Sequence, residues 1–399
     1  MTTSRVSRPQ RYWRQFISSV AALTLAGSLA ACSVPSIAPS STDTSTDTST
    51  DTSSGTASTA TAEATTGATP AATGTDSVAG TGASAENTAA VSEAAAAFKA
   101  TLTEDQIAVL SFDYADTAAK SNWSNLPEGL VERSGVTMGE LTEEQRTAAL
   151  ALLQAMLSDE GYEQVLETMA ADDVLASGSL SGGMGPQLDW SSDNYFFAFF
   201  GDPTADSRFM IQFGGHHLAL NIDYSDGAVT MTPEFVGIEP QTWTDASGTT
   251  MEPLAALKDA VFAVLDSLGA EESAASELAQ IYDDVVMGAG ADDDAFPEDG
   301  GVLVSDLTQD QQDLVTAAIE EWVGDIDETV AAEIVASYVD AYDETYIAWS
   351  GSTDSGSEDA YFRISGPAVW IEYVHQSGIG GSDIHLHTVY RDKTSAYGA

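Results

Sequence analysis

The stretch that decides the fold is YFFAFFG at residues 195–201, because a similar stretch, TYIAWSG at residues 345–351, follows 150 residues later. Both are short runs rich in aromatic residues that end at a glycine, a composition typical of β-strands. Two further predicted strands follow in each copy: residues 211–215 and 218–222, and residues 362–366 and 369–373. The chain therefore repeats one set of strands, and strands that follow one another directly favour an antiparallel meander.

Predicted helices precede the strands in each copy. The segments LTEEQ at residues 141–145 and LTQDQ at residues 307–311 each predict a helix start, with threonine as the N-cap and glutamine three residues further on. A third segment of this form, LTEDQ, occupies residues 102–106. Apolar residues at helical spacing then predict a second helix in each copy, over residues 162–175 and 328–342.

We interpret the folded part, residues 87–399, as one α+β domain. It contains two diverged helix–helix–antiparallel-sheet units, about residues 141–231 and 307–390, packed together. One more helical pair is predicted between the units, over residues 253–287.

The N-terminus has the pattern of a bacterial lipoprotein signal peptide. Four arginines and no acidic residue lie in the first 16 positions, and an apolar run then leads to LAAC at residues 29–32. A basic segment, a short apolar segment and small residues before a cleavage point define an export signal, and LAAC resembles the lipobox, whose cysteine is acylated. We predict that residues 1–31 are removed and that Cys32, the only cysteine in the chain, carries the lipid. The alternative is an ordinary signal peptide in which the cysteine is incidental.

Residues 32–86 have the composition of a disordered tether. Ser, Thr, Ala, Gly and Asp dominate after Cys32, residues 42–53 read TDTSTDTSTDTS, and no aromatic residue is present. Such a segment cannot bury enough apolar surface to offset its conformational entropy. We therefore expect a lipid-anchored protein at the cell membrane, with its folded domain held away from the extracytoplasmic face.

The chain after Cys32 is strongly acidic. All 62 acidic residues but only nine of the 13 lysines and arginines follow this cysteine, so the cleaved chain carries a net charge of −53. Nucleic-acid binding needs a basic surface, so nucleic acid is excluded as a partner. Anionic lipid is repelled as well, which leaves the acyl chains as the attachment to the membrane. The other candidate partner is an extracellular small molecule or polymer.

A set of short motifs covers nearly the whole folded region. They are WSNLP at 123–127, FFG at 199–201, QFGGHHL at 212–218, RISGP at 363–367, IEY at 371–373 and HLH at 385–387. In combination they resemble DUF3500, a family of bacterial domains of unknown function. Because the family has no established reaction, the resemblance implies a domain identity but no catalytic residue.

The histidines are the residues best suited to a metal site. His385 and His387 stand two apart on a predicted strand, so both side chains point to one face. His216 and His217 are adjacent, so we expect them to point to opposite faces and only one to join a common site, His217 with His216 as the alternate. Three imidazoles with an open fourth position suit Zn²⁺, and copper also binds imidazole.

Glu372 and Asp383 are the candidates to complete this site, as a fourth ligand or as a hydrogen-bond acceptor behind a ligand. In the other copy, HH aligns with PA at residues 367–368, and HLH aligns loosely with VTM at residues 229–231. The scaffold therefore does not need imidazole at these positions, which favours a functional role. The alternative is that they are ordinary histidines of a sheet.

Standard catalytic motifs are absent from the sequence: it contains no Walker loop, GxSxG, HExxH or GxGxxG pattern. Two classes of function remain. One is an exported, lipid-anchored surface protein with a histidine-centred site, metal-dependent or metal-free, for hydrolytic or redox chemistry. The other is a non-catalytic surface lipoprotein that binds a ligand or a partner. The catalytic residues stay unassigned.

Overall fold

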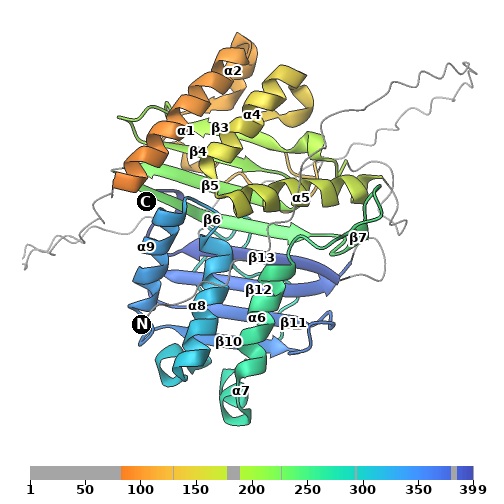
Figure 1. The fold of residues 1–399 in the computed structure, drawn as a ribbon, viewed down its shortest axis with the longest axis vertical. Helices are drawn as coiled ribbons and strands as arrows, with labels where there is room; N and C mark the ends of the chain where they lie inside the picture. The colour runs from red at the N-terminus through yellow and green to blue at the C-terminus, as the bar shows by residue number, and fades with distance from the viewer. Residues whose placement is uncertain are drawn as a thin grey trace, which may run out of the picture. The chain divides into compact units, whose positions relative to one another are not determined.

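One large sheet organises the folded part of the chain (Figure 1). The computed structural model describes residues 82–128, 130–177, 189–225, 227–292, 294–378 and 384–398. The predicted signal peptide, Cys32 and the predicted tether up to residue 81 lie outside the described residues. Within them the sheet has eleven strands in the order β1-β3-β4-β5-β6-β13-β12-β11-β10-β9, with β2 paired to β3.

Each copy contributes an antiparallel meander, as predicted, with a fourth strand after the three predicted ones. The first consists of β3 (Phe196–Phe200), β4 (Phe209–Gly214), β5 (Leu218–Ser225) and β6 (Ala228–Ile238), and the second of β10 (Tyr346–Gly351), β11 (Ala360–Ser365), β12 (Val369–Ser377) and β13 (Ile384–Asp392). The meanders join into one sheet because β6 pairs antiparallel with β13, with Gly237 opposite His387.

Short strands complete the sheet and one hairpin. They are β1 (Ser111–Phe112), β2 (Val136–Thr137) and β9 (Val302–Leu303) at the sheet edges, and β7 (Trp243–Thr244) with β8 (Thr250–Met251) as a separate pair. The β1–β3 pair is parallel, whereas the pairs within and between the meanders are antiparallel.

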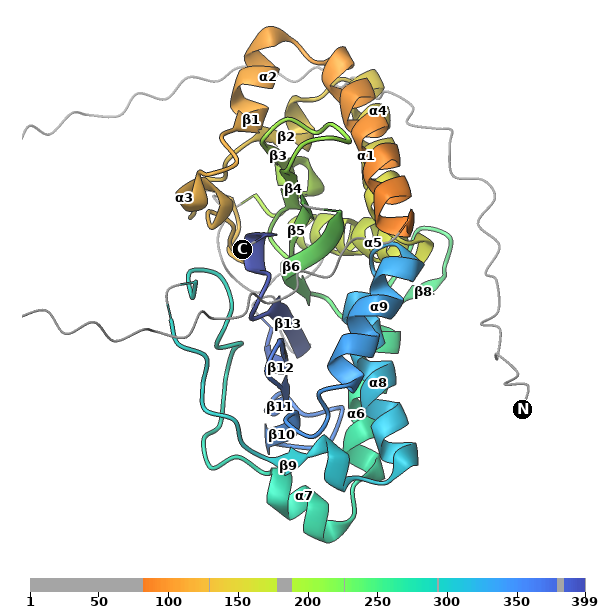
Figure 2. The ribbon, with the colours of Figure 1, turned by 90° about the vertical axis from the view of Figure 1, so that its left-hand side faces the viewer.

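Nine α-helices lie in the described residues. They are α1 (Gly82–Thr101), α2 (Glu104–Leu110), α3 (Thr117–Lys120), α4 (Glu143–Met156), α5 (Asp159–Ala176), α6 (Ala255–Ser267), α7 (Ala270–Ser276), α8 (Gln309–Val323) and α9 (Glu328–Val339). Figure 2 shows α1, α4, α5, α6, α8 and α9 against one face of the sheet, with α3 and the chain between α7 and β9 on the other side. Helices and one large sheet together confirm the predicted α+β class.

The predicted helix starts are confirmed, and they reveal a longer repeat. Thr103, Thr142 and Thr308 cap α2, α4 and α8, each in a capping box with the glutamine three residues on. Gln145 Nε2 also donates to Thr101 O at the end of α1, and Gln311 Nε2 donates to Ser267 O at the end of α6, both at 2.9 Å. The pair α6–α7 therefore corresponds to α1–α2 and belongs to the second copy, rather than standing between the copies.

Two predicted boundaries differ in the structure. The helical pair predicted up to residue 287 ends at Ser276, and residues 277–292 instead cross, without helical structure, the face of the sheet that carries α3; we call them the covering segment. After α7 the N–H of Leu278 bonds to Trp349 O, and those of Val286 and Met287 bond to the Glu372 carboxylate, so these donors bind the sheet rather than a helix. The fold also begins earlier than the predicted residue 87, since α1 starts at Gly82 and Ser84 in its first turn is buried.

The main core lies between the helices and the sheet, and Leu386 and Tyr390 of β13 point into it. A smaller cluster on the other face contains Val389. Because side chains alternate along a strand, His385 and His387 share the face of Val389. The two histidines therefore lie on the face of the sheet opposite the main core, under the covering segment.

Candidate metal centre

Three imidazoles converge where the two meanders join. His217 precedes β5, whereas His385 and His387 lie in the first half of β13. Their pairing to β6 brings them together: Gly237 of β6 opposes His387 and donates its N–H to His217 O at 2.8 Å. One ring nitrogen from each of the three histidines lies within 4.8 Å of the others.

Two of the inner nitrogens of these rings face each other, and the third has no partner among the described residues. His217 Nε2 lies 2.8 Å from His385 Nε2, and His387 Nε2 is buried with no hydrogen-bond partner among the described residues. Exposure is 0 % for His217, 3 % for His385 and 4 % for His387. A buried acceptor without a donor costs free energy, and a cation bound by all three rings would remove this cost. For comparison, two nitrogens bound tetrahedrally to Zn²⁺ lie roughly 3.3 Å apart.

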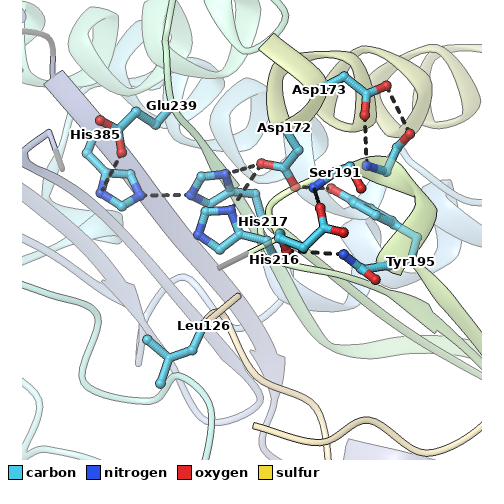
Figure 3. A network of polar contacts seen from close by, with 12 residues as sticks. Leu126, Asp172, Asp173, Ser191, Tyr195, His216, His217, Glu239 and His385 are labelled. Atoms are coloured by element: carbon cyan, nitrogen blue, oxygen red, sulfur yellow. Dashed lines mark hydrogen bonds and ion pairs between the residues drawn. The ribbon is translucent and has the colours of Figure 1, made fainter. Parts of the chain in front are cut away.

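A carboxylate faces the outer nitrogen of each ring, and Figure 3 shows two of these contacts, Asp172 with His217 and Glu239 with His385. The Nδ1 atom of His217 lies 2.7 Å from Asp172, that of His387 2.9 Å from Asp284, and that of His385 3.7 Å from Glu239. These acids come from α5, from the covering segment and from the chain just after β6. The first two distances are hydrogen bonds, and the third is the longer contact of an ion pair. Metal-binding histidines typically have such a hydrogen bond, because an outer carboxylate holds the proton on one nitrogen and leaves the other free for the metal.

Burial determines the charge state of this cluster. It lowers the pKa of His217, of His385 and of His387, and neighbouring histidines lower all three further. Burial alone would raise the pKa of Asp172, but the charges and hydrogen bonds of His217 and His216 bring it below its ordinary value. Neutral imidazole beside ionised carboxylate is the form that binds a metal ion.

His216 corrects one expectation from the sequence. The adjacent pair was expected to point to opposite faces, yet His216 Nδ1 and His217 Nδ1 both contact Asp172 Oδ1, at 3.1 and 2.7 Å, and their ring centroids are 3.6 Å apart. The reason is that β5 begins only at Leu218, so the pair lies in the bend before the strand, where side chains do not alternate. Trp190 packs edge-on against His216.

Glu372 is not part of the cluster. Its two carboxylate oxygens accept hydrogen bonds from backbone N–H groups of the covering segment and from the side chains of Tyr361 and Trp370. This saturated carboxylate has no role as a fourth ligand, which corrects the expectation from the sequence. The other candidate, Asp383, lies outside the described residues. His375 lies apart, between Tyr373 OH and Ser357 O.

One family model, described as a protein of unknown function (DUF3500), matches residues 84–399. The chain belongs to the DUF3500 family. Neither a curated protein nor a solved structure matches it. Among the residues that the structure describes, no helix combines the length and the apolar character needed to cross a membrane.

The cluster occupies only one of two equivalent places in the DUF3500 domain. Leu218 opposite Val236 corresponds to Val369 opposite Asp392 in the other copy. The pairing of β5 with β6 contains a register shift between Leu220 and Ile222. When this shift is taken into account, HLH at residues 385–387 corresponds to residues 228–230 of the first copy. This is one residue earlier than the loose alignment predicted from the sequence. The counterparts of the ligand candidates are Ala228, Thr230 and Ala368. The fold therefore forms this geometry without imidazole.

Sequence patterns missed the three outer carboxylates of the DUF3500 domain. Asp172 lies within an acidic helix, Glu239 precedes a proline, and Asp284 lies where a helix was predicted. Of the three, only Glu239 stands in a recognisable short pattern, the Glu-Pro pair at residues 239–240. Their common feature is position in space, since each faces a different histidine.

Proposed function

We propose that this protein is an exported, lipid-anchored surface protein whose domain binds one divalent transition-metal ion at His217, His385 and His387. The observation that carries the proposal is the convergence of three buried imidazoles, each with a carboxylate at its outer nitrogen. A structural cluster of sheet histidines would need a hydrogen-bond partner for every buried ring nitrogen, and His387 Nε2 has none among the described residues.

The ligand set favours zinc or copper. Three neutral imidazoles suit both ions, and this set of three contains neither a thiolate nor a carboxylate, although His217 also belongs to a second possible ligand group with Asp172 and His216. Three protein ligands leave a fourth position for water or substrate, the arrangement of catalytic rather than structural zinc sites. Zinc would support hydrolysis through a metal-bound hydroxide, and copper would support redox chemistry.

Metal analysis tests the centre directly. Protein purified without an affinity tag should contain about one zinc or copper ion per chain by inductively coupled plasma mass spectrometry. The double variant His385→Ala/His387→Ala should lose it, whereas His375→Asn, which removes a histidine outside the cluster, should keep it. Metal content that the double variant retains would refute the centre.

The open position separates the two classes of function. Co²⁺ substituted into the site should show a d–d spectrum that changes when azide is added, because azide can take the fourth position. A spectrum unchanged by azide would favour the alternative, a non-catalytic surface lipoprotein that binds a ligand or partner.

The anchoring part of the proposal rests on residues 1–86. An export signal ending at Cys32, a spacer without aromatic residues and an acidic domain together support lipid as the membrane attachment. Cells expressing the wild type should incorporate a labelled fatty acid into the protein and retain it in the membrane fraction. Cys32→Ser should abolish both, and Ser33→Ala should abolish neither.

A further inference from the structure

The covering segment is fastened to the sheet by a buried carboxylate. Glu372 of β12 is 0 % exposed and accepts the N–H groups of Val286 at 2.9 Å and Met287 at 2.8 Å. The hydroxyl of Tyr361 and the indole N–H of Trp370 complete four donors, each of these at 2.8 Å. Two of the four hydrogen bonds to the Glu372 carboxylate therefore come from consecutive residues of the covering segment.

A buried guanidinium holds the same residues through their carbonyl groups. Arg391 of β13 donates to Met287 O at 2.6 Å, to Gly288 O at 3.0 Å and to the Asp292 carboxylate at 2.9 Å. Arg391 is 3 % exposed. Releasing the covering segment would leave two opposite buried charges without their partners, which is strongly unfavourable. The segment is thus held in a single register against the sheet.

Asp284 lies immediately before this fastened stretch. Its Oδ1 atom accepts the N–H of Val285 at 2.7 Å and lies 2.9 Å from His387 Nδ1. The Asp284 side chain is 46 % exposed, whereas those of Asp172 and Glu239 are 0 % and 1 % exposed. Burial therefore helps to fix the other two carboxylates, and the Tyr195 hydroxyl also donates to Asp172 at 2.8 Å, whereas the exposed Asp284 depends on the backbone that follows it.

We infer that Glu372 is a positioning residue of the metal centre: by holding Val286 and Met287 it places Asp284 against His387. His387 Nδ1 lies 2.9 Å from Asp284 Oδ1 and 3.0 Å from the side-chain amide of Gln376. The Asp284 carboxylate can only accept, so it favours the proton on Nδ1 and directs Nε2 toward the metal position. The inference rests on the proposed metal centre and assigns to it a residue that touches no ligand ring. Coupling of this kind is reciprocal, so metal binding also strengthens the docking of the covering segment.

The first test compares zinc affinities, measured by competition with a chromophoric chelator. Asp284→Asn should raise the Kd for Zn²⁺ about 10- to 100-fold, the usual cost of losing an outer-shell partner. Glu372→Gln should raise it in the same direction, and the double variant should bind no more weakly than the weaker single variant, because both act through one contact. Asp299→Asn is the matched control: its side chain is also 46 % exposed, on the same connection to β9, but it contacts Lys393 and Ser365.

The outcomes separate this inference from the proposed function. Wild-type protein that binds no zinc overturns the metal centre itself. If the wild type binds zinc and Glu372→Gln has an unchanged Kd, only the positioning role is overturned. The same holds if the effects of Asp284→Asn and Glu372→Gln on the Kd add in full in the double variant.

A second measurement needs no variant of Glu372 and so holds if Glu372→Gln does not fold. Hydrogen exchange of the Val286 and Met287 amides should slow on addition of zinc by a larger factor than that of the Leu278 amide, which bonds to Trp349 O. In Asp284→Asn this extra slowing should disappear. Equal slowing at all three amides in the wild type would refute the link between the covering segment and the metal.

Discussion

At the residue scale, Gly237 makes the convergence of imidazoles sterically feasible. A Cβ atom at this position would lie 2.9 Å from Cδ2 of His217 and 2.9 Å from Cδ2 of His387. Both distances are below any normal contact, and the third neighbour, Leu386 O at 3.0 Å, is backbone and cannot rotate away. The absence of a side chain is therefore what allows two rings to lie over one strand.

We predict that Gly237→Ala weakens metal binding at least tenfold, because the methyl group displaces one or both rings by a few tenths of an ångström or more. Equilibrium zinc titration measures the effect. Gly356→Ala is the control, since Gly356 is exposed and its added Cβ would meet only Asp354 Oδ1, at 3.5 Å. An unchanged affinity in Gly237→Ala would show that the rings do not bind a common ion.

At the element scale, each copy uses one glutamine to join three helices. Gln311 accepts from the N-cap of its own helix, α8, and donates to Ser267 O at the end of α6 and to Glu272 of α7. Gln145 makes the corresponding contacts in the first copy. The capping box that was recognised in the sequence as a local signal therefore also fixes the packing of α1 on α4 and of α6 on α8.

Replacing this glutamine should cost more than an N-cap alone. We expect Gln311→Ala to lower the free energy of unfolding by about 1–3 kcal/mol, because it removes a cap contact and leaves Ser267 O without its side-chain donor. Gln309→Ala, on the exposed side of the same helix, should change it by less than about 0.5 kcal/mol. Urea denaturation compares the two, and equal losses would contradict the structural role of Gln311.

At the scale of the whole molecule, a pair of buried acids lies between the sheet and the helices. Burial raises the pKa of Glu234 on β6 well above its ordinary value, and the nearby carboxyl of Asp325 raises it further. Burial raises the pKa of Asp325, at the α8–α9 junction, to about 7, and the charges of Glu321 and Glu160 also raise it. Gln164 donates a hydrogen bond to Asp325, which acts in the opposite direction.

The pair should make the folded state less stable at high pH. Both groups have folded-state pKa values above their unfolded values of about 4. The stability that they contribute to the folded state is therefore fully present below about pH 4 and is lost as the pH rises through 7. We expect the Tm to fall between pH 5 and pH 8, and to fall less steeply in Glu234→Gln. Glu333→Gln, an exposed acid on α9, should keep the wild-type slope. Parallel slopes in all three proteins, measured by scanning calorimetry, would exclude the pair as the cause.

Local patterns of the sequence determined the elements and part of the candidate site. The capping boxes, the strand repeat and the shared face of His385 and His387 follow from helical and strand periodicity, which acts over a few residues. The same reasoning failed for His216 and His217, because alternation applies only inside a strand and β5 begins at Leu218.

The tertiary structure alone decided which residues meet. Asp172, Glu239 and Asp284 face the histidines because β6 pairs with β13 and because Glu372 and Arg391 hold the covering segment across that junction. Pairing between strands so distant in the chain depends on the packing of the whole sheet, which no short stretch encodes. The amino-acid sequence thus supplied the imidazoles, and the joining of two meanders placed them around one point.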